Sequence, residues 1–355
     1  MRIICLIFLL FSVSACTTVG TMRSAAVQAK PDPQYRTYSP EKKHHTERGF
    51  QNVGGFKPSP GAGFVHHIFN RFSKSAVLPD NHVLSHDEVQ QQLKRARSAP
   101  VSVTWIGHST MLIRVGEKWI LTDPFFGERA SPVPGIGPSR SVPAALSVAE
   151  LPPIDVIMIS HNHYDHLDGP AMAQLARRNP DAVVLVPLVN GGTARRAGFR
   201  DVRELDWYDE ENAGGLRVTS LPAVHSSRRG LMNKNKALWG GWSIRAGKRR
   251  IYFGGDTGYG TFARDIREKL GRHHIALVPI GAYQPQSLES AFHVTPEDAV
   301  RIARTLGARH IFPMHWGTIA LTAEPFKEQK RRFLAASKGL RGAKVMKIGA
   351  TVALR

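Results

Sequence analysis

The chain has 355 residues and is 42% hydrophobic, which supports one large folded domain or two small ones and excludes a globally disordered protein. Lys and Arg number 48 against 28 acidic residues, so the formal net charge of +20 favours anionic partners such as phospholipid headgroups, phosphorylated small molecules or nucleic acid. The basic residues are scattered and accompany no nucleic-acid-binding motif, so we expect no specific nucleic-acid partner and consider a phospholipid surface at least as good a candidate.

Residues 1–15 are predicted to be a secretory signal. Arg2 is followed by an apolar run from Ile3 to Val13, which is shorter than the roughly 20 residues of a membrane span. The sequence VSAC at 13–16 resembles the bacterial lipobox, which implies cleavage before Cys16 and diacylation of its sulfur. An ordinary signal peptide with an incidental cysteine is the alternative. The other cysteine, Cys5, would leave with the signal, so the mature protein would have no disulfide and no catalytic thiol.

This signal predicts a lipid-anchored protein of a bacterial cell envelope. Thr17, rather than Asp, follows the lipidated position, which in a Gram-negative bacterium favours the outer membrane, facing the periplasm. Residues 16–60 are rich in Thr, Ser, Pro, Gly, Lys and His and are predicted to be a tether from that anchor.

Residues 61–99 are predicted to form an N-terminal helical extension. Apolar residues at 64, 65, 68, 69 and 72 have helical spacing with one apolar face. Such a helix either contacts lipid or a partner chain, or packs on the main domain, and we favour packing. His66 and His67 are then not expected to be metal ligands.

The compact domain is expected at residues 100–355, with strands and helices mixed throughout, as in a sandwich of sheets with helices outside. A loop rich in Pro and Gly at 131–143 is long enough to form a wall of an active site. Strands are predicted at 101–106, 111–115, 119–122, 154–159, 183–186, 216–223, 238–245, 250–253, 275–280, 310–314, 344–348 and 351–354. Helices are predicted at 170–178, 262–270, 296–306 and 325–337.

A histidine-rich loop, SHNHYDHLDG at 160–169, follows the buried strand predicted at 154–159. His161 and His163 are two residues apart and face the same side of an extended backbone, whereas Asp165 and His166 lie past the turn and can reach a second point. Imidazole and carboxylate groups are the ligands expected for zinc or a similar divalent metal. A solvated histidine-rich loop is the alternative, but four ligand-type residues at one strand end favour a metal site.

Four more ligand-type residues stand at predicted strand ends far along the chain: Asp123, His225, Asp256 and His315. Taken singly, each has an ordinary alternative, such as a capping Asp or a solvated surface His. Ligands delivered one per strand end are how rigid scaffolds build metal sites. Together with the loop they would complete two coordination shells.

The pattern HxHxDH, a later His, an Asp in GDTG and a final His resembles the metallo-β-lactamase superfamily. Further motifs resemble one branch of it, the N-acyl-phosphatidylethanolamine-hydrolysing phospholipases D, over about residues 100–350. These motifs are WIGHST at 105–110, TDPFF at 122–126, LPPID at 151–155, LDW at 205–207, LWG at 238–240, GDTGY at 255–259, IGAY at 280–283, HVTPEDAV at 293–300, HWGT at 315–318 and, weakly, GFQN at 49–52. The resemblance implies an α/β fold, the αββα four-layer sandwich, preceded by the N-terminal extension.

The resemblance implies two zinc ions per chain. The first would be held by His161, His163 and His225. The second would be held by Asp165, His166 and His315, and Asp256 would bridge both ions. The same resemblance places Asp123, and less directly His108 and Asp168, where side chains order the ligands without binding metal.

The implied reaction is phosphodiester hydrolysis of phospholipase D type by a metal-bridging hydroxide, on N-acyl-phosphatidylethanolamine or a related phospholipid. Asp256 and Asp165 would serve the reaction as ligands, and Asp256 would also orient the hydroxide. Tyr164 and His293 match positions that line the substrate cleft, where His293 would bond a phosphate oxygen or assist the leaving group. Phe292 departs from the resembled enzymes, which have a polar residue before the cleft histidine, so the preferred acyl groups stay open.

Three other functions are alternatives to this reaction. A sugar-phosphate lactonase or a nuclease on the same two-metal scaffold is the main alternative, since fold does not fix substrate. A non-catalytic lipoprotein is disfavoured because a structural zinc is normally closed by four protein ligands around one ion. The flanking motifs disfavour a β-lactam hydrolase. The oligomeric state stays open, with a homodimer as one option.

Overall fold

The computed structural model describes residues 38–54, 77–230 and 232–354. The signal peptide, Cys16 and the helix predicted at 64–72 lie outside these residues and stay predictions. Among the described residues, none of the helices has the length and apolar content needed to cross a bilayer.

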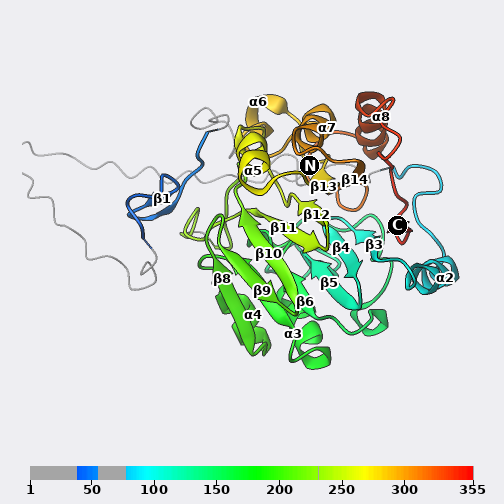
Figure 1. Ribbon diagram of the computed structural model, residues 1–355, viewed down its shortest axis with the longest axis horizontal. Helices are drawn as coiled ribbons and strands as arrows, with labels where there is room; N and C mark the ends of the chain where they lie inside the picture. Colours follow the sequence, from blue (N-terminus) through cyan, green and yellow to red (C-terminus); the bar gives the residue numbers. More distant parts are fainter. Residues whose placement is uncertain (1–37, 55–76, 231, 355) are drawn as a thin grey trace, which may run out of the picture.

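Two mixed β-sheets lie at the centre of the domain (Figure 1). In the described part, one sheet has seven strands in the order β15-β3-β4-β5-β6-β7-β8, and the other has six in the order β14-β13-β12-β11-β10-β9. The first comprises β3 (Val101–Gly107), β4 (Thr110–Val115), β5 (Lys118–Thr122), β6 (Val156–Met158), β7 (Val183–Pro187), β8 (Asp201–Leu205) and β15 (Thr351–Leu354). The second comprises β9 (Glu210–Ala213), β10 (Leu216–Leu221), β11 (Gly241–Ala246), β12 (Arg249–Phe253), β13 (Ile275–Pro279) and β14 (His310–Met314).

The central strands β3, β4, β6 and β7 of the seven-stranded sheet are buried along nearly their whole length because each face of the sheet is covered. On β4, Met111 and Ile113 pack in the core between the two sheets, whereas Leu112 packs in the cluster beneath the helices. Helices α2 (His86–Ala96), α3 (Gly169–Arg178) and α4 (Gly191–Ala197) cover that outer face. Helices α5 (Phe262–Leu270), α6 (Gln286–Glu289), α7 (Pro296–Thr305) and α8 (Phe326–Ala336) gather at the opposite side of the molecule (Figure 1). The predicted αββα sandwich is confirmed.

The strand predicted at 344–348 is not formed. Ala343 and Ile348 make only isolated bridges, with Ile311 and Val83. The segment contains both buried and exposed residues, as a strand at the surface does. Among the described residues, however, no strand pairs with it between these two bridges, so no β-ladder forms.

Residues 38–54 lie within the segment predicted as a tether, and they are packed on the domain. They form the short hairpin of β1 (His45–Thr46) and β2 (Gly49–Phe50). The ring of Phe50 is buried in a small cluster with Trp207, Leu238 and Trp239. This segment therefore belongs to the fold that surrounds the site described next.

Candidate metal centre

The predicted ligands meet at one end of the sandwich, where strands from both sheets end. Asp123 directly follows β5, the histidine-rich loop follows β6, Asp256 follows β12, and His315 directly follows β14. Three residues here have a positive φ: His108 (52°), Asp123 (35°) and His315 (57°). The left-handed conformation costs a non-glycine residue roughly 1–2 kcal/mol. Such strain persists where the surrounding structure imposes it, which is typical of functional sites.

The first cluster consists of His161, His163 and His225. Nδ1 of His163 lies 2.8 Å from Nε2 of His161 and 3.3 Å from Nε2 of His225. The ring of His225 is oriented by its Nδ1, which is 2.9 Å from the carbonyl oxygen of Phe292, so Nδ1 donates and Nε2 keeps its lone pair. All three rings are buried or nearly so.

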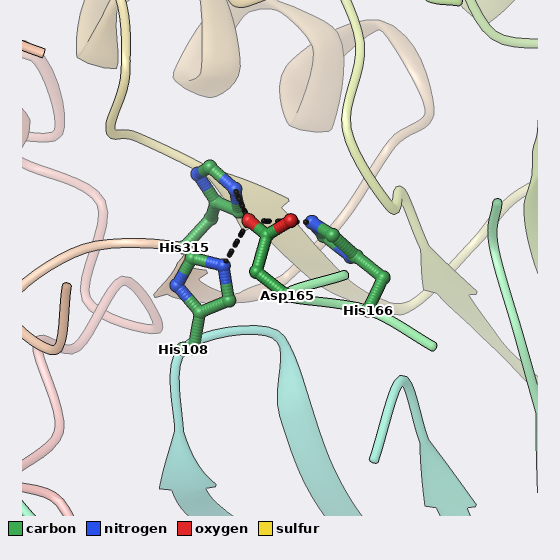
Figure 2. Close-up of side chains that lie close together, drawn as sticks. All are labelled: His108, Asp165, His166 and His315. Atoms are coloured by element: carbon green, nitrogen blue, oxygen red, sulfur yellow. Dashed lines mark hydrogen bonds and ion pairs between the residues drawn. The ribbon is translucent and has the colours of Figure 1, made fainter. Parts of the chain in front are cut away.

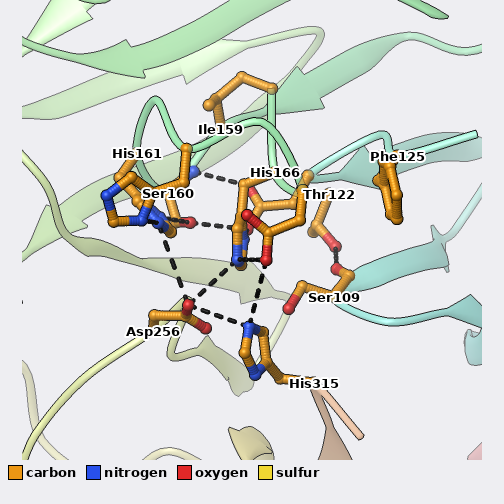
Figure 3. A network of polar contacts seen from close by, with 12 residues as sticks. Ser109, Thr122, Phe125, Ile159, Ser160, His161, His166, Asp256 and His315 are labelled. Carbon is orange, nitrogen blue, oxygen red and sulfur yellow. Dashed lines mark hydrogen bonds and ion pairs between the residues drawn. The ribbon is translucent and has the colours of Figure 1, made fainter. Parts of the chain in front are cut away.

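The second cluster consists of Asp165, His166 and His315, with Asp256 beside it (Figures 2 and 3). Oδ2 of Asp256 is 3.1 Å from Nε2 of His166 and 3.0 Å from Nε2 of His315. Oδ2 of Asp165 is 3.4 and 3.6 Å from the same two nitrogens. Oδ2 of Asp256 also lies 4.0 Å from Nε2 of His161 and 3.9 Å from Nε2 of His225, so this carboxylate stands between the clusters.

These separations fit metal ligation. Nitrogen or oxygen ligands about 2.0–2.1 Å from a tetrahedral metal are roughly 3.3 Å apart, close to the 3.0–3.6 Å of the second cluster. Nε2 of His166 and Nε2 of His315 are buried and make no hydrogen bond, and the same is true of Oδ1 of Asp256. Buried polar atoms are normally paired, and a shared cation satisfies them. The clusters can therefore bind metal.

The protonation states follow from burial and charge. Burial lowers the pKa of His161 and His225 well below the usual value and that of His163 to about 4, so these imidazoles are neutral, as metal ligands must be. Burial also lowers the pKa of His315, but the charge of Asp256 and the contacts with the carboxylates of Asp165 and Asp256 together outweigh it and raise the pKa to about 9. The carboxylate of Asp256 therefore stabilises a positive charge on the neighbouring imidazole of His315. A bound metal ion would supply this positive charge in place of the proton.

Asp123 lies beneath the histidine-rich loop and holds it by three bonds. Its Oδ1 accepts from the backbone N–H of Ser160 at 2.6 Å, and its Oδ2 accepts from the Ser160 hydroxyl at 2.6 Å and from Nδ1 of His166 at 2.7 Å. The Ser160 hydroxyl also lies 2.9 Å from Nδ1 of His161 (Figure 3). Asp123 thus fixes the ring and tautomer of His166, as predicted of a residue that orders ligand loops.

His108 and Asp168, which were predicted to support the ligands, differ in what they contact. Nε2 of His108 is 2.9 Å from Oδ2 of Asp165, as Figure 2 shows. Asp168 caps α3 by accepting from the N–H of Ala171, and it also accepts from the N–H groups of Phe126 and Gly127. Asp168 therefore joins two loops and does not contact a ligand side chain through these bonds.

The predicted substrate residues lie at the partly exposed side of the clusters. His293 is half-buried, with Nδ1 3.9 Å from Oδ2 of Asp256. The ring of Tyr164 lies beneath the guanidinium of Arg229, 4.3 Å from its Cζ, and its hydroxyl donates to the carbonyl oxygen of Arg229 at 2.5 Å. His293 thus borders the clusters, Tyr164 contacts Arg229, and the role of both residues in binding substrate stays a prediction.

Two residues that support the site were not singled out from the sequence. Arg229 donates to the carbonyl oxygens of Asn162 and Leu167, at 3.1 and 2.7 Å, and so clamps the histidine-rich loop. Asn52 bonds the backbone of His225. Asn52 lies in the weak GFQN match, which was a signal for it, whereas Arg229 lies in no motif.

Comparison with known proteins places this site in a family. Residues 118–316 match the family described as "Beta-lactamase superfamily domain". A relative from Caenorhabditis elegans named N-acyl-phosphatidylethanolamine-hydrolyzing phospholipase D 1 is 36% identical over 239 residues, covering 64% of this chain and 67% of the relative. The mitochondrial enzyme of that name from Saccharomyces cerevisiae is 31% identical over 264 residues, covering 72% of this chain and 55% of the relative.

More distant relatives share the fold. A UPF0173 metal-dependent hydrolase from Koribacter versatilis is 28% identical, covering 65% of this chain and 91% of the relative. The solved structure of a possible metal-dependent hydrolase from Veillonella parvula superposes with a TM-score of 0.59 at 19% identity, covering 72% of this chain and 100% of that one. The chain belongs to the metallo-β-lactamase superfamily and is a metal-dependent hydrolase of that fold.

Proposed function

We propose that the protein is a zinc-dependent phosphodiesterase of phospholipase D type, which hydrolyses N-acyl-phosphatidylethanolamine or a related phospholipid. The observation that carries this proposal is the 36% identity to a relative named for that activity, over two thirds of its length. The imidazoles and carboxylates that the site brings together are ligands that zinc takes. The two clusters joined by Asp256 support two ions per chain.

A pair of divalent ions held by these clusters would supply Lewis-acid charge for the phosphate and would lower the pKa of a bound water. Asp256 then has two tasks, since its carboxylate lies within 4.0 Å of His161, His166 and His315. It would hold the two clusters together and orient the attacking water.

His293 would act on the phosphate itself. Burial lowers its pKa to about 3, so the ring is neutral and carries one N–H. Its half-buried position beside Asp256 lets this N–H donate to a phosphate oxygen. Tyr164, held by Arg229, would form the neighbouring wall of the lipid path.

The lipid substrate also agrees with the predicted anchor. Lipidation of Cys16 would keep the enzyme at a membrane, proposed to be the outer membrane facing the periplasm, where its substrate lies. The formal net charge of +20 would strengthen contact with anionic headgroups.

The test is product analysis on defined lipids. Purified, zinc-loaded protein is incubated with vesicles containing N-acyl-phosphatidylethanolamine, phosphatidylethanolamine or phosphatidylcholine, and products are identified by mass spectrometry. We expect phosphatidic acid and the free N-acylated alcohol, and far less of both from the variant Asp256→Asn. Turnover of soluble lactones or oligonucleotides by the same preparation, without phosphatidic acid from any lipid, would refute the proposal.

A further inference from the structure

The backbone of His225 is held by a residue that lies 173 positions earlier in the chain. Oδ1 of Asn52 accepts from the N–H of His225 at 2.9 Å, and Nδ2 of Asn52 donates to the carbonyl oxygen of His225 at 2.9 Å. The pair of bonds also fixes which atom of the amide is oxygen, because the N–H needs an acceptor and the carbonyl needs a donor. Oδ1 accepts in addition from Nε1 of Trp239 at 3.1 Å.

His225 depends on this amide because β10 has already ended at Leu221. The side chain of Asn52 takes the place of a strand neighbour and satisfies both backbone groups of a buried residue. The ring of His225 is held separately, through Nδ1 and the carbonyl oxygen of Phe292. Backbone and ring are thus each fixed, which directs Nε2 toward His163 and Asp256.

Asn52 belongs to a segment that is itself firmly anchored, residues 38–54, called here the N-terminal strap. Asp206, which directly follows β8, accepts from Nζ of Lys42 at 2.6 Å and lies 2.6 and 2.9 Å from Nε2 of His44 and of His45. Nδ1 of His45 accepts from the backbone N–H of Ser39, so its Nε2 carries the proton and donates to Asp206. This cluster is therefore an ion-pair anchor and not a third metal site.

The other end of the strap is fixed by backbone contacts. The N–H of Phe50 donates to the carbonyl oxygen of Asn235 at 2.8 Å. Gly49, at φ +139°, lies so close to the same carbonyl that an added Cβ would be 2.2 Å from it. The close approach of strap and domain at position 49 thus requires glycine. Asn52, three residues later, then lies against His225.

We propose that Asn52 is a positioning residue for the metal ligand His225, and that the N-terminal strap thereby controls metal binding at the cluster of His161, His163 and His225. The inference rests on the proposed two-ion site. The strap precedes the matched superfamily region, residues 118–316, so this support comes from outside the family's core.

The variant Asn52→Ala removes both bonds to His225. We expect the affinity of the three-histidine cluster for zinc to fall about 10–100-fold, the usual effect of losing a residue that orients a ligand. The cluster of Asp165, His166 and His315 should keep its affinity. The variant Asn52→Asp keeps the acceptor for the N–H of His225 but sets a carboxylate oxygen against the carbonyl oxygen of His225, where Nδ2 now donates, so its loss should be at least as large.

The matched control is Gln51→Ala. Gln51 is the exposed neighbour of Asn52, and its side chain donates to the carbonyl oxygen of Lys43 within the strap. This variant should bind two ions with the affinities of the natural protein. Its behaviour separates the effect of the bonds to His225 from a general effect of altering the strap.

The measurement is titration of metal-free full-length protein with zinc against a chromophoric chelator, followed by cobalt(II) substitution, whose absorption reports each site's geometry. Loss of one of two binding steps in Asn52→Ala and in Asn52→Asp supports the inference. Wild-type affinity for both ions in either variant overturns it. Should Asn52→Ala fail to fold by circular dichroism, Asn52→Asp decides alone.

These outcomes are independent of the substrate. If the natural protein releases no phosphatidic acid but Asn52→Ala loses one zinc step, the proposed phospholipase activity fails and the inference stands. If the natural protein hydrolyses the lipid and Asn52→Ala binds both ions unchanged, the inference fails and the activity stands.

Discussion

Replacing Asp123 by Asn tests how the second cluster is built. The carboxylate only accepts hydrogen bonds, and it serves three donors: the Ser160 N–H, the Ser160 hydroxyl and Nδ1 of His166. The amide of Asn has only one oxygen, so an NH₂ group, which donates, replaces one of the two carboxylate oxygens, which accept. With its oxygen toward the Ser160 N–H, the amide NH₂ faces Nδ1 of His166 and imposes the opposite tautomer.

That tautomer carries its proton on Nε2, the nitrogen that lies 3.1 Å from Oδ2 of Asp256. The lone pair needed for a metal is then lost. The reverse amide orientation sets two N–H donors against each other and costs roughly 1–3 kcal/mol of stability. We therefore expect Asp123→Asn to weaken binding of the second ion about 10–100-fold, or about 1.4–2.8 kcal/mol.

The assay is zinc titration of the metal-free variant, with urea unfolding measured in parallel. Asp155→Asn is the matched control, because Asp155 also accepts from a backbone N–H, that of Trp119, and from the side chain of Lys118, away from the site. The control should bind both ions normally. Unchanged affinity and stability in Asp123→Asn would refute the tautomer argument.

Three further predictions concern catalysis, pH and the core. Asp256→Asn should lower the rate of hydrolysis about 10³-fold, because several kcal/mol of charge stabilisation is lost with the shared carboxylate. Steady-state kinetics that differ little from those of the natural enzyme would contradict this. Burial lowers the pKa of His273 to about 4 from 6.5 in the unfolded chain, so its contribution to stability is complete above about pH 6.5 and declines as pH falls toward 4. The free energy of unfolding in urea should therefore fall by about 2 kcal/mol between pH 7 and pH 5 from this residue, and His273→Gln should lack this part of the pH dependence. In the same assay, Phe253→Ala should lower the free energy of unfolding by about 3–5 kcal/mol and Ile251→Val by only about 0.5–1.5 kcal/mol, because both side chains are fully buried between the layers. Equal losses would contradict the packing described.

The metal clusters could be predicted because their signal is local. The spacing of His161 and His163 predicts that both rings face one side of an extended backbone, and Asp165 and His166 follow past the turn. Asp123, Asp256 and His315 each follow an apolar run, and the structure places them at strand ends as expected.

The supports of the site carry no such signal. The bonds of Asn52 to His225 and of Arg229 to Asn162 join residues 173 and 67 positions apart, and a side-chain amide or guanidinium meeting a backbone carbonyl has no periodic pattern. Helix α2 lies within the helical extension predicted at 61–99, but its bounds were not predicted, although Ser85 and Glu88 form a capping box, a spacing that marks a helix start.

The N-terminal strap has a consequence for the order in which the protein matures during synthesis. The strap is made first, yet its anchors, Asp206 and His225, follow more than 150 residues later. The three-histidine cluster is complete once His225 has emerged, whereas the second cluster waits for His315, near the end of the chain. Because an unfolded chain has no preformed site, metal loading is a late event that follows docking of the two sheets. A nascent chain that ends before His315 therefore lacks a ligand of the second cluster. A chain without residues 38–54 lacks the bonds of Asn52 to the backbone N–H and carbonyl oxygen of His225.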